Sequence, residues 1–323
     1  MGCGASVEQP PRQLVLLGGG ESGKTTIFKQ IQILHGTGFD DKADEYKDVI
    51  QNSAIRSVQT LLAALPQAGV SSLTEANKAA AERCAQLSPG ALTPDAAEDI
   101  AAVWNDPAIA ELLSTVKLDL DDNAKFFLNR VEKIASTSYK PITEEILKVR
   151  DPTRSIDCLD FQHKKAKFRV IDVGGQRMER PKWNLTGEVT AVIFVVSLIE
   201  YNQVLREDVK QNRLKESINL FDIACNRRYP DKPIILFLNK EDIFEEMIKT
   251  VDLKVCFPTY KGGCDKEAAL AYIKYKFCHV RKDKDKRIYV FVTTATDTRN
   301  MEHIIDSLVD IVEKQNLDAS GFS

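Results

Sequence analysis

Hydrophobic and polar positions follow two different patterns along the 323-residue chain. Near the N-terminus and after residue 155, short apolar runs are followed by amphipathic segments, which predicts strands alternating with helices. Between about residues 40 and 140, apolar residues recur at three- and four-residue intervals, which predicts helices alone. The expected strands cover residues 14–17, 158–163, 166–172, 191–197, 233–239 and 288–293, and a last helix covers residues 298–315.

The helical region is divided by residues that interrupt helices. Gly69, the run Ser88-Pro89-Gly90 and the pair Asp106-Pro107 separate the periodic segments. Thr93 before Pro94 is a favourable helix start, because threonine caps the first turn and proline suits the first helical position. The expected helices cover residues 46–65, 93–104, 107–113 and 121–135.

These elements predict an α/β fold. Buried strands separated by helices favour a mainly parallel sheet covered on both faces. The helical region is then an insertion of roughly 100 residues, the size of a small domain. We expect an N-terminal arm over residues 1–11, an α/β domain over residues 12–37 and 148–323, and an inserted all-helical domain over residues 38–147.

The first apolar run leads into a phosphate-binding motif. Residues 16–26 read LLGGGESGKTT, in which Gly18, Gly23, Lys24 and Thr25 complete G-x-x-x-x-G-K-[ST] between a strand and a helix. The glycines allow backbone N–H groups to surround phosphate oxygens, and the helix directs its positive end at the same anion. Lys24 is expected to reach the β- and γ-phosphates, and the Thr25 hydroxyl to bind Mg²⁺. The alternative is a glycine-rich turn that fits the pattern by chance.

A second motif follows the strand predicted at residues 166–172. The sequence FRVIDVGGQR places Asp172 at the strand end, where it would hold Mg²⁺ directly or through water. Gly175 offers a backbone N–H to a γ-phosphate, and Gln176 is placed to orient an attacking water. The same letters also describe an ordinary turn at a strand end.

Two further motifs indicate guanine recognition. Asn239, Lys240 and Asp242 form N-K-x-D at the carboxyl end of a strand, where ligands of open α/β sheets bind. The Asp242 carboxylate can accept hydrogen bonds from guanine N1 and N2, so the site would select GTP over ATP. In TTATDT, the Ala295 N–H is expected to meet guanine O6, although this stretch is equally a helix cap around Asp297.

Composition and charge exclude several classes of function. The net charge of −3 and the pI near 5.9 imply no nucleic-acid partner. No apolar run approaches the ~20 residues that span a bilayer. The seven cysteines and four histidines have neither disulfide nor zinc spacing, which suits a reducing compartment.

The N-terminus carries a lipidation signal. MGCGAS fits the myristoylation motif through Gly2 and Ser6, and Cys3 beside it is a candidate for palmitoylation. One acyl chain binds membranes only marginally, so a second signal is needed. Arg12 is the sole cation among the first 20 residues, so no polybasic segment near the lipid supplies that signal.

The chain resembles the α subunits of heterotrimeric G proteins over nearly its whole length. The resemblance is carried by four motifs that occur in the family's order around a helical insertion, namely GGGESGKTT, DVGGQR, LNKED and TTATDT. It implies a Ras-like P-loop GTPase domain with an inserted all-helical domain. It also implies GTP or GDP as the bound nucleotide, Mg²⁺ as cofactor, and partners comprising a G protein-coupled receptor, a βγ dimer and an effector. The implied location is the cytoplasmic face of the plasma membrane, through the lipid.

The resemblance adds two residues that no motif singles out. In YKPITEEILKVRDPT, it implies that Arg150 is a built-in arginine finger and that Thr153 completes the Mg²⁺ shell with Thr25, while Glu21 pairs with Arg150. Gln176 and Arg150 are then the catalytic residues. The implied nucleotide contacts come from Gly18, Gly19, Gly20, Glu21, Ser22, Gly23, Lys24, Thr25, Thr26, Leu147, Lys148, Arg150, Thr153, Asp172, Gly175, Asn239, Lys240, Asp242 and Ala295.

The chain also departs from the family pattern. In the family, a helix that contacts the βγ dimer normally precedes the first strand. We expect this helix to be missing here, because only a few residues precede the strand and the pair Pro10-Pro11 among them would stop a helix. Binding of βγ would then be weakened. The resemblance implies two switch segments that respond to the γ-phosphate, residues 148–153 and 174–183. Pro181 replaces a basic residue in the second switch, and Arg154-Ser155 replaces a Thr-Gly pair where GTPase-accelerating proteins dock. Alternatives left open are a GTP-binding scaffold without meaningful hydrolysis, a βγ-independent GTPase switch, a small monomeric GTPase and a P-loop kinase.

Overall fold

The computed structural model describes residues 10–39, 42–116, 118, 120–153, 155–164, 166–205 and 207–319, with side chains as far as residue 315. The chain forms two compact units, which are Met1–Gly38 with Pro152–Ser323, and Phe39–Asp151. The second unit ends four residues later than the predicted insertion. Lys148 and Arg150 therefore belong to the helical unit and not to the α/β unit, whereas Leu147 lies in the helical unit as predicted.

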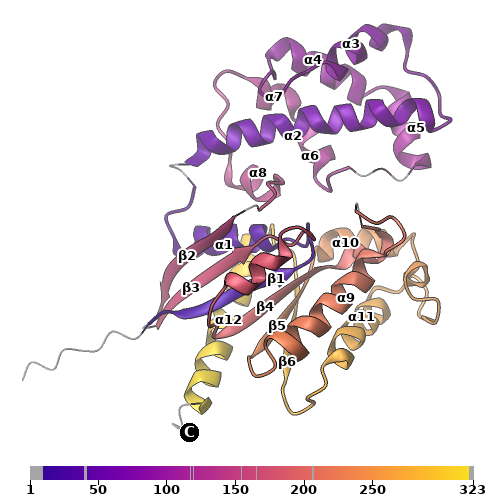
Figure 1. The fold of residues 1–323 in the computed structure, drawn as a ribbon. Helices are drawn as coiled ribbons and strands as arrows, with labels where there is room; N and C mark the ends of the chain where they lie inside the picture. Colours follow the sequence, from indigo (N-terminus) through magenta and orange to yellow (C-terminus); the bar gives the residue numbers. More distant parts are fainter. Residues whose placement is uncertain are drawn as a thin grey trace, which may run out of the picture. The chain divides into compact units, whose positions relative to one another are not determined.

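A six-stranded sheet forms the centre of the first unit, in the order β2-β3-β1-β4-β5-β6 (Figure 1). Only β2 runs antiparallel, paired with β3, and every other neighbouring pair is parallel. The prediction of a mainly parallel sheet is therefore confirmed. The strands are β1 (Arg12–Gly18), β2 (Ile156–His163), β3 (Ala166–Val173), β4 (Ala191–Ser197), β5 (Ile234–Asn239) and β6 (Ile288–Thr293).

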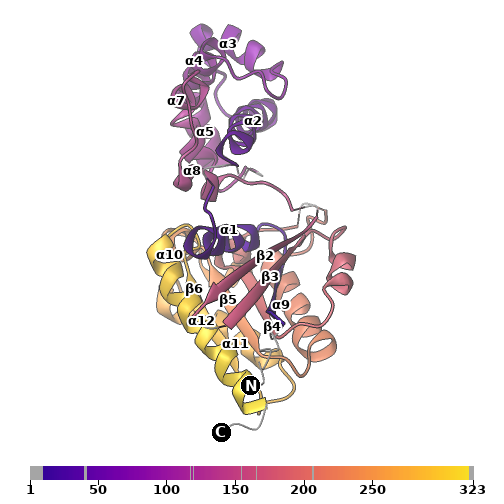
Figure 2. The same cartoon turned by 90° about the vertical axis from the view of Figure 1, so that its left-hand side faces the viewer.

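The sheet is covered on both faces because the central strands β4 and β5 are apolar at every position before their last residues, Ser197 and Asn239. In β4, Val192, Phe194 and Val196 pack into one cluster, whereas Ile193 and Val195 pack into the other. This alternation follows from the two-residue period of a strand. Helices α1 (Lys24–His35) and α12 (Thr298–Ala319) cover one face, while α9 (Arg213–Ile223), α10 (Glu241–Ile248) and α11 (Lys266–Val280) cover the other (Figure 2).

The second unit is helical throughout its regular elements and has its own apolar core. The helix predicted over residues 121–135 was wrong, because two short helices interrupted at Asn129 and Arg130 occupy this stretch. The Asn129 side chain accepts a hydrogen bond from Trp104 Nε1 (2.6 Å) at the break. The helices are α2 (Ala43–Ala64), α3 (Glu75–Ala85), α4 (Pro94–Trp104), α5 (Pro107–Thr115), α6 (Ala124–Leu128), α7 (Val131–Ala135) and α8 (Thr143–Lys148).

Short helical turns connect several of these elements. The turns are η2 (Leu65–Gln67), η3 (Arg180–Leu185), η4 (Leu198–Asn202), η5 (Ala224–Arg228) and η6 (Leu253–Val255).

Within the described ranges, no helix combines the length and apolar character needed to cross a membrane.

Candidate functional site

The loop between β1 and α1 has a backbone that only glycine allows at two positions. Gly18 and Gly23 have φ values of 142° and 103°. A Cβ on Gly18 would lie 2.1 Å from the Val195 carbonyl oxygen, and one on Gly23 would lie 2.1 Å from Asn239 Nδ2. The loop therefore packs closely against the carboxyl ends of β4 and β5, and its N–H groups and the start of α1 form a cradle for an anion.

Lys24 is buried inside this loop. Its Nζ donates to the carbonyl oxygens of Gly19 (2.7 Å) and Gly18 (3.3 Å). Burial lowers the pKa of Lys24 to about 8, although the carboxylates of Asp172 and Glu200 partly oppose that shift. A buried ammonium with only carbonyl partners is suited to bind phosphate oxygens, which would favour its charged form.

Three oxygen-bearing side chains predicted to surround Mg²⁺ converge beside the loop. Thr25 Oγ1 lies 2.6 Å from Thr153 Oγ1 and 2.8 Å from Asp172 Oδ2, and Thr153 Oγ1 lies 3.3 Å from the same carboxylate oxygen. Asp172 is buried, and its Oδ1 has no hydrogen-bond partner. Burial raises the pKa of Asp172, mainly because the carboxylate is removed from water.

This donor set fits a magnesium ion. Mg²⁺ is bound in proteins by one or two carboxylates, together with hydroxyls, waters and substrate phosphates. The unpartnered Asp172 oxygen and the two threonine hydroxyls supply such ligands. Among the described residues there is no group of three His, Cys, Asp or Glu side chains that would suit a different metal centre.

The second motif lies directly against the phosphate loop. A Cβ on Gly175 would lie 2.3 Å from Lys24 Nζ and 2.5 Å from the Gly18 carbonyl oxygen, so this position has no room for a side chain. Gln176 is exposed, and its Cγ would be 3.2 Å from a Cβ on Gly20. Both predicted residues therefore lie directly beside the loop between β1 and α1.

The base-recognition motif is organised by Asn239. Its Nδ2 donates to the Ser22 carbonyl (3.0 Å), and its Oδ1 accepts from Thr293 Oγ1 and from the Ala295 N–H, both at 3.0 Å. The Ala295 N–H is thus engaged within the protein, and its predicted contact with guanine O6 would have to share or replace this bond. Asp242, in the first turn of α10, is exposed.

Sequence reasoning missed a cluster of charged residues beside the loop. Arg213 of α9 pairs with Glu21 (Nη1 to Oε2, 2.7 Å) and donates to the Gly20 carbonyl. Buried Glu200 accepts a hydrogen bond from Ser217 Oγ (2.5 Å), and burial raises its pKa. Arg213, Glu216 and Ser217 are spaced three and four residues apart and so share one face of α9, but ordinary amphipathic helices have the same spacing, so it did not single these residues out.

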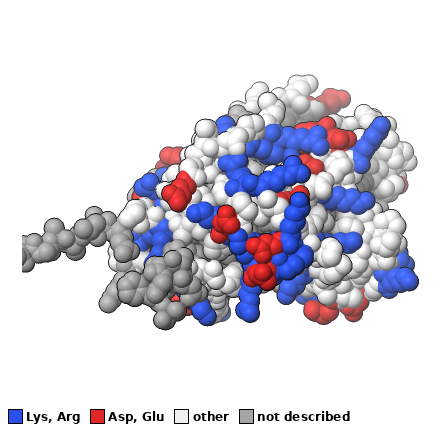
Figure 3. All heavy atoms as spheres, turned by 60° about the horizontal axis from the view of Figure 1, so that its bottom comes forward, with Lys and Arg blue, Asp and Glu red and all other residues white. Residues whose placement is uncertain are grey.

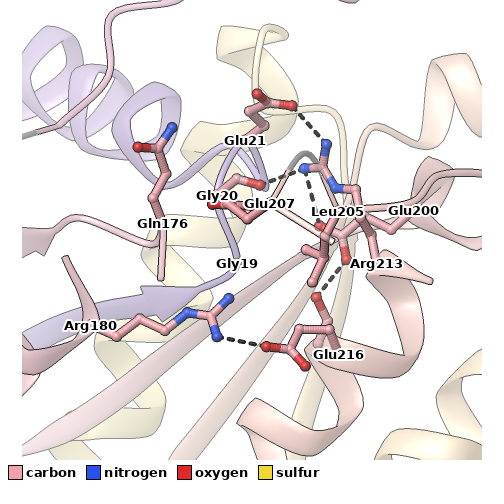
Figure 4. A pocket seen from close by; sticks show the side chains of 11 residues that line it. Gly19, Gly20, Glu21, Gln176, Arg180, Glu200, Leu205, Glu207, Arg213 and Glu216 are labelled. Carbon is pink, nitrogen blue, oxygen red and sulfur yellow. Dashed lines mark hydrogen bonds and ion pairs between the residues drawn. The ribbon is translucent and has the colours of Figure 1, made fainter. Parts of the chain in front are cut away.

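These residues line a pocket between the phosphate loop, the second motif and α9 (Figure 4). Gln176 and Arg180 approach it from one side, and Arg213 from the other. The lining residues are Gly19, Gly20, Glu21, Gln176, Arg180, Glu200, Leu205, Glu207, Arg213, Glu216 and Ser217.

The segment after Gln176 is attached to α9 by Arg180. Its Nε donates to the Gly175 carbonyl (3.2 Å), and its Nη1 lies 2.6 Å from Glu216 Oε1. Pro181 is accommodated because it lies in the first turn of η3, where a missing N–H costs little. Trp183 is buried and donates to the Gly174 carbonyl (2.9 Å), so its ring reports on this segment.

Several predicted residues lie outside the α/β unit that holds the phosphate-binding loop, or outside the described part of the chain. Arg150 lies in the helical unit, where its Nη1 pairs with Asp121 Oδ1 (2.8 Å), so its role and its pairing with Glu21 stay predictions. Leu147 and Lys148 belong to the same unit. Gly2, Cys3 and Arg154 lie outside the described residues.

Comparison with known proteins agrees with this geometry. The family model described as G-protein alpha subunit matches residues 5–312. The guanine nucleotide-binding protein alpha-2 subunit of Dictyostelium discoideum is 38% identical in an alignment of 323 positions, gaps included, that covers 96% of this chain and 90% of that protein. The G(o) subunits alpha of Locusta migratoria and Caenorhabditis elegans are each 38% identical, with the same shares covered.

Proposed function

The chain belongs to the family of G-protein alpha subunits, and we propose that it hydrolyses the GTP that it binds. As a member of this family it is a guanine nucleotide-binding switch in signal transduction. The observation that carries the proposal is the convergence of Thr25, Thr153 and Asp172 beside a phosphate loop that also contacts Gln176. A single-turnover assay with GTP labelled in the γ-phosphate tests it.

The proposed binding of nucleotide uses the two ends of the site. Lys24 and the loop N–H groups hold the phosphates, while Asp242 accepts hydrogen bonds from the guanine ring. Thr25, Thr153 and Asp172 would hold Mg²⁺, which would supply positive charge to neutralise the negative charge that develops on the phosphates. Asn239 connects both ends, because it bonds to the phosphate loop and to the loop after β6.

The proposed reaction is in-line attack of water on the γ-phosphate, in which a bond forms between the water oxygen and the γ-phosphorus while the bond from that phosphorus to the β–γ bridging oxygen breaks, so that GDP and phosphate are the products. Gln176 orients the water, the Gly175 N–H donates to a γ-phosphate oxygen, and Lys24 stabilises the negative charge of the transition state. Arg150 acts as the arginine finger. Loss of the γ-phosphate then removes contacts from the segments that carry Thr153 and Gln176, so hydrolysis ends the active state.

Replacing Asp242 by asparagine should weaken GTP binding by about 100-fold, since charge-assisted hydrogen bonds to guanine are worth about 1.5–3 kcal/mol. Titration of a fluorescent GTP analogue measures the affinity. Xanthosine triphosphate should bind the variant better than it binds the wild type, because its oxygen at C2 can accept from the new amide. Asp252→Asn is the matched control. Equal GTP affinity in wild type and Asp242→Asn would refute the assigned role.

Removing the carboxylate of Glu216 should release the second switch from α9. Glu216→Gln breaks its ion pair with Arg180, which should shift the switch toward its released form about 5- to 30-fold, the effect of roughly 1–2 kcal/mol. Trp183 fluorescence after addition of a non-hydrolysable GTP analogue measures the shift, in a Trp104→Phe background. Glu246→Gln, which breaks an exposed pair with Lys249, should leave the signal unchanged.

We further propose attachment to the cytoplasmic face of the plasma membrane through myristate on Gly2 and palmitate on Cys3. A receptor, a βγ dimer and an effector are the proposed partners. Mass spectrometry of the N-terminal peptide from cells tests the acylation, with Gly2→Ala as the variant that should carry no myristate. An unmodified wild-type N-terminus would contradict the proposed anchor.

A further inference from the structure

Two loops far apart in sequence meet where β5 and β6 begin, at the opposite ends of these strands from the N-K-x-D and TTATDT motifs. Asn226 Nδ2 donates to the Val280 carbonyl (2.8 Å), and its Oδ1 accepts from the Lys282 N–H (2.9 Å). Lys286 Nζ pairs with Asp231 Oδ1 (2.6 Å). Residues 226–232 and 279–287 therefore form one continuous surface, which we term the basic surface.

The basic surface carries a charge opposite to that of the whole chain. It contains eight lysines and arginines against three aspartates, which leaves a net charge of +5, whereas the chain has −3. Figure 3 looks toward the lower end of Figure 1 and shows Lys and Arg side chains gathered close together. Such local concentration of one sign creates a positive potential even on a protein that is acidic overall.

Several of these cations keep their charge available to a partner. Lys286 is paired with Asp231 and Asp283, and Lys232 lies 3.8 Å from Glu188. Arg281 is buried, and Arg228 donates to Asn184 Oδ1 and to the Trp183 carbonyl. The other four cations reach solvent, and within the part of the chain that the structure describes they form no ion pair. These exposed cations are Arg227, Lys282, Lys284 and Arg287.

The start of β1 lies at the same end of the sheet. The Gln13 N–H donates to Thr190 Oγ1 (3.0 Å), the Thr190 N–H donates to the Gln13 carbonyl (2.7 Å), and the Val192 N–H donates to the Pro233 carbonyl (3.0 Å). The N-terminal ends of β1, β4 and β5 are thus adjacent. Gly2 precedes Pro10 by eight residues, which reach at most about 26–29 Å when extended. A lipid on Gly2 would hold this end of the sheet within that distance of a bilayer.

We propose that the basic surface binds the anionic lipid headgroups of the cytoplasmic leaflet and acts as a membrane-binding signal beside the acyl chains. This inference rests on the proposed lipid attachment. The N-terminal sequence offers only Arg12 near the lipid, and Arg12 is paired with Glu313. The folded chain supplies the missing cations from the two loops, and clusters of this kind are attracted to phosphatidylserine-rich surfaces.

The test uses the full-length Gly2→Ala protein, so that no acyl chain contributes. Sedimentation with phosphatidylcholine vesicles, with and without phosphatidylserine, measures binding. We expect binding only with phosphatidylserine, and its loss between about 0.1 M and about 1 M salt, as the Debye length falls from about 10 Å to about 3 Å. Equal binding to both vesicles, or no binding to either, would overturn the proposal; the second result would leave an acidic protein partner as the alternative.

A charge variant identifies the surface. Changing Arg227, Lys282, Lys284 and Arg287 to glutamine should lower the partition onto phosphatidylserine vesicles by about 100-fold, because each cation near the surface contributes about 1 kcal/mol at most. A control variant removes the same charge from the exposed residues Lys42, Arg56, Lys125 and Lys140 of the helical unit.

The outcomes separate this inference from the proposed anchor. The variant of the basic surface should bind GTP like the wild type, since its residues lie at the opposite ends of β5 and β6 from the N-K-x-D and TTATDT motifs. The control variant should also keep its GTP affinity, since none of its four residues is among the predicted nucleotide contacts. Equal loss of vesicle binding in the two variants would show that overall charge, and not this surface, is responsible. Acylation is read independently by mass spectrometry of wild-type protein, so failure of the anchor and failure of the basic surface give different results.

Discussion

Replacing Arg150 by alanine is expected to slow single-turnover GTP hydrolysis by about 10³–10⁵-fold while leaving GTP affinity nearly unchanged. The factor is the one known for GTPases of this class, and it does not come from this structure. A guanidinium that contacts the γ-phosphate only as charge develops there stabilises the transition state and not the ground state. Phosphate release after rapid mixing of preloaded protein with Mg²⁺ measures the rate.

The control for Arg150 separates catalysis from local structure. Asp121→Asn removes the partner of Arg150 in the helical unit and leaves the arginine itself. We expect only a small change of rate in this variant, because surface ion pairs of this kind contribute about 0–1 kcal/mol. A rate in Arg150→Ala equal to that of the wild type would show that Arg150 is not the finger.

Replacing Gln176 by leucine should lower the same rate constant by about 10²–10⁴-fold, the usual contribution of a group that orients and polarises a nucleophile. Gln176 is exposed at the edge of the phosphate loop, and the change removes no buried contact. The variant should therefore fold and bind GTP like the wild type, and stay longer in its active state. Trp183 fluorescence and phosphate release in one sample measure both quantities.

A matched change elsewhere controls for the loss of a polar side chain. Gln162 is also exposed, lies on β2, and donates only to the Lys164 carbonyl (3.2 Å). Gln162→Leu should hydrolyse GTP at the wild-type rate. If Gln176→Leu did the same, the water-orienting role would have to belong to another residue.

The sheet could be predicted from the sequence because its strands are buried on both faces. The strands at residues 191–197 and 288–293 were predicted with the observed bounds, and the other four to within two residues at each end. The break at Asn129 was not predictable, because apolar residues on both sides keep a helical period. A tertiary contact with Trp104, unseen in local sequence, accompanies the break.

The arrangement of residues at the candidate site was largely predictable because its motifs follow strand ends. Parallel strands bring those ends to one edge, so the loop after β1 meets Asp172 and Asn239. Arg213 and Glu200 were missed, since nothing in the local sequence distinguishes them from the charged residues of an ordinary helix and turn. The basic surface was missed for a similar reason, because residues 226–232 and 279–287 become neighbours only in the fold.

The central claim is that this chain is a switch whose active state ends by its own hydrolysis of GTP. The most direct measurement follows phosphate release and Trp183 fluorescence together during one turnover of GTP, in the Trp104→Phe protein. The account predicts that fluorescence changes on Mg²⁺–GTP loading and returns with the rate constant of phosphate release, and that Gln176→Leu slows both equally. A persistent fluorescence change without phosphate release in the protein with Gln176 intact would contradict it, and would indicate a GTP-binding scaffold.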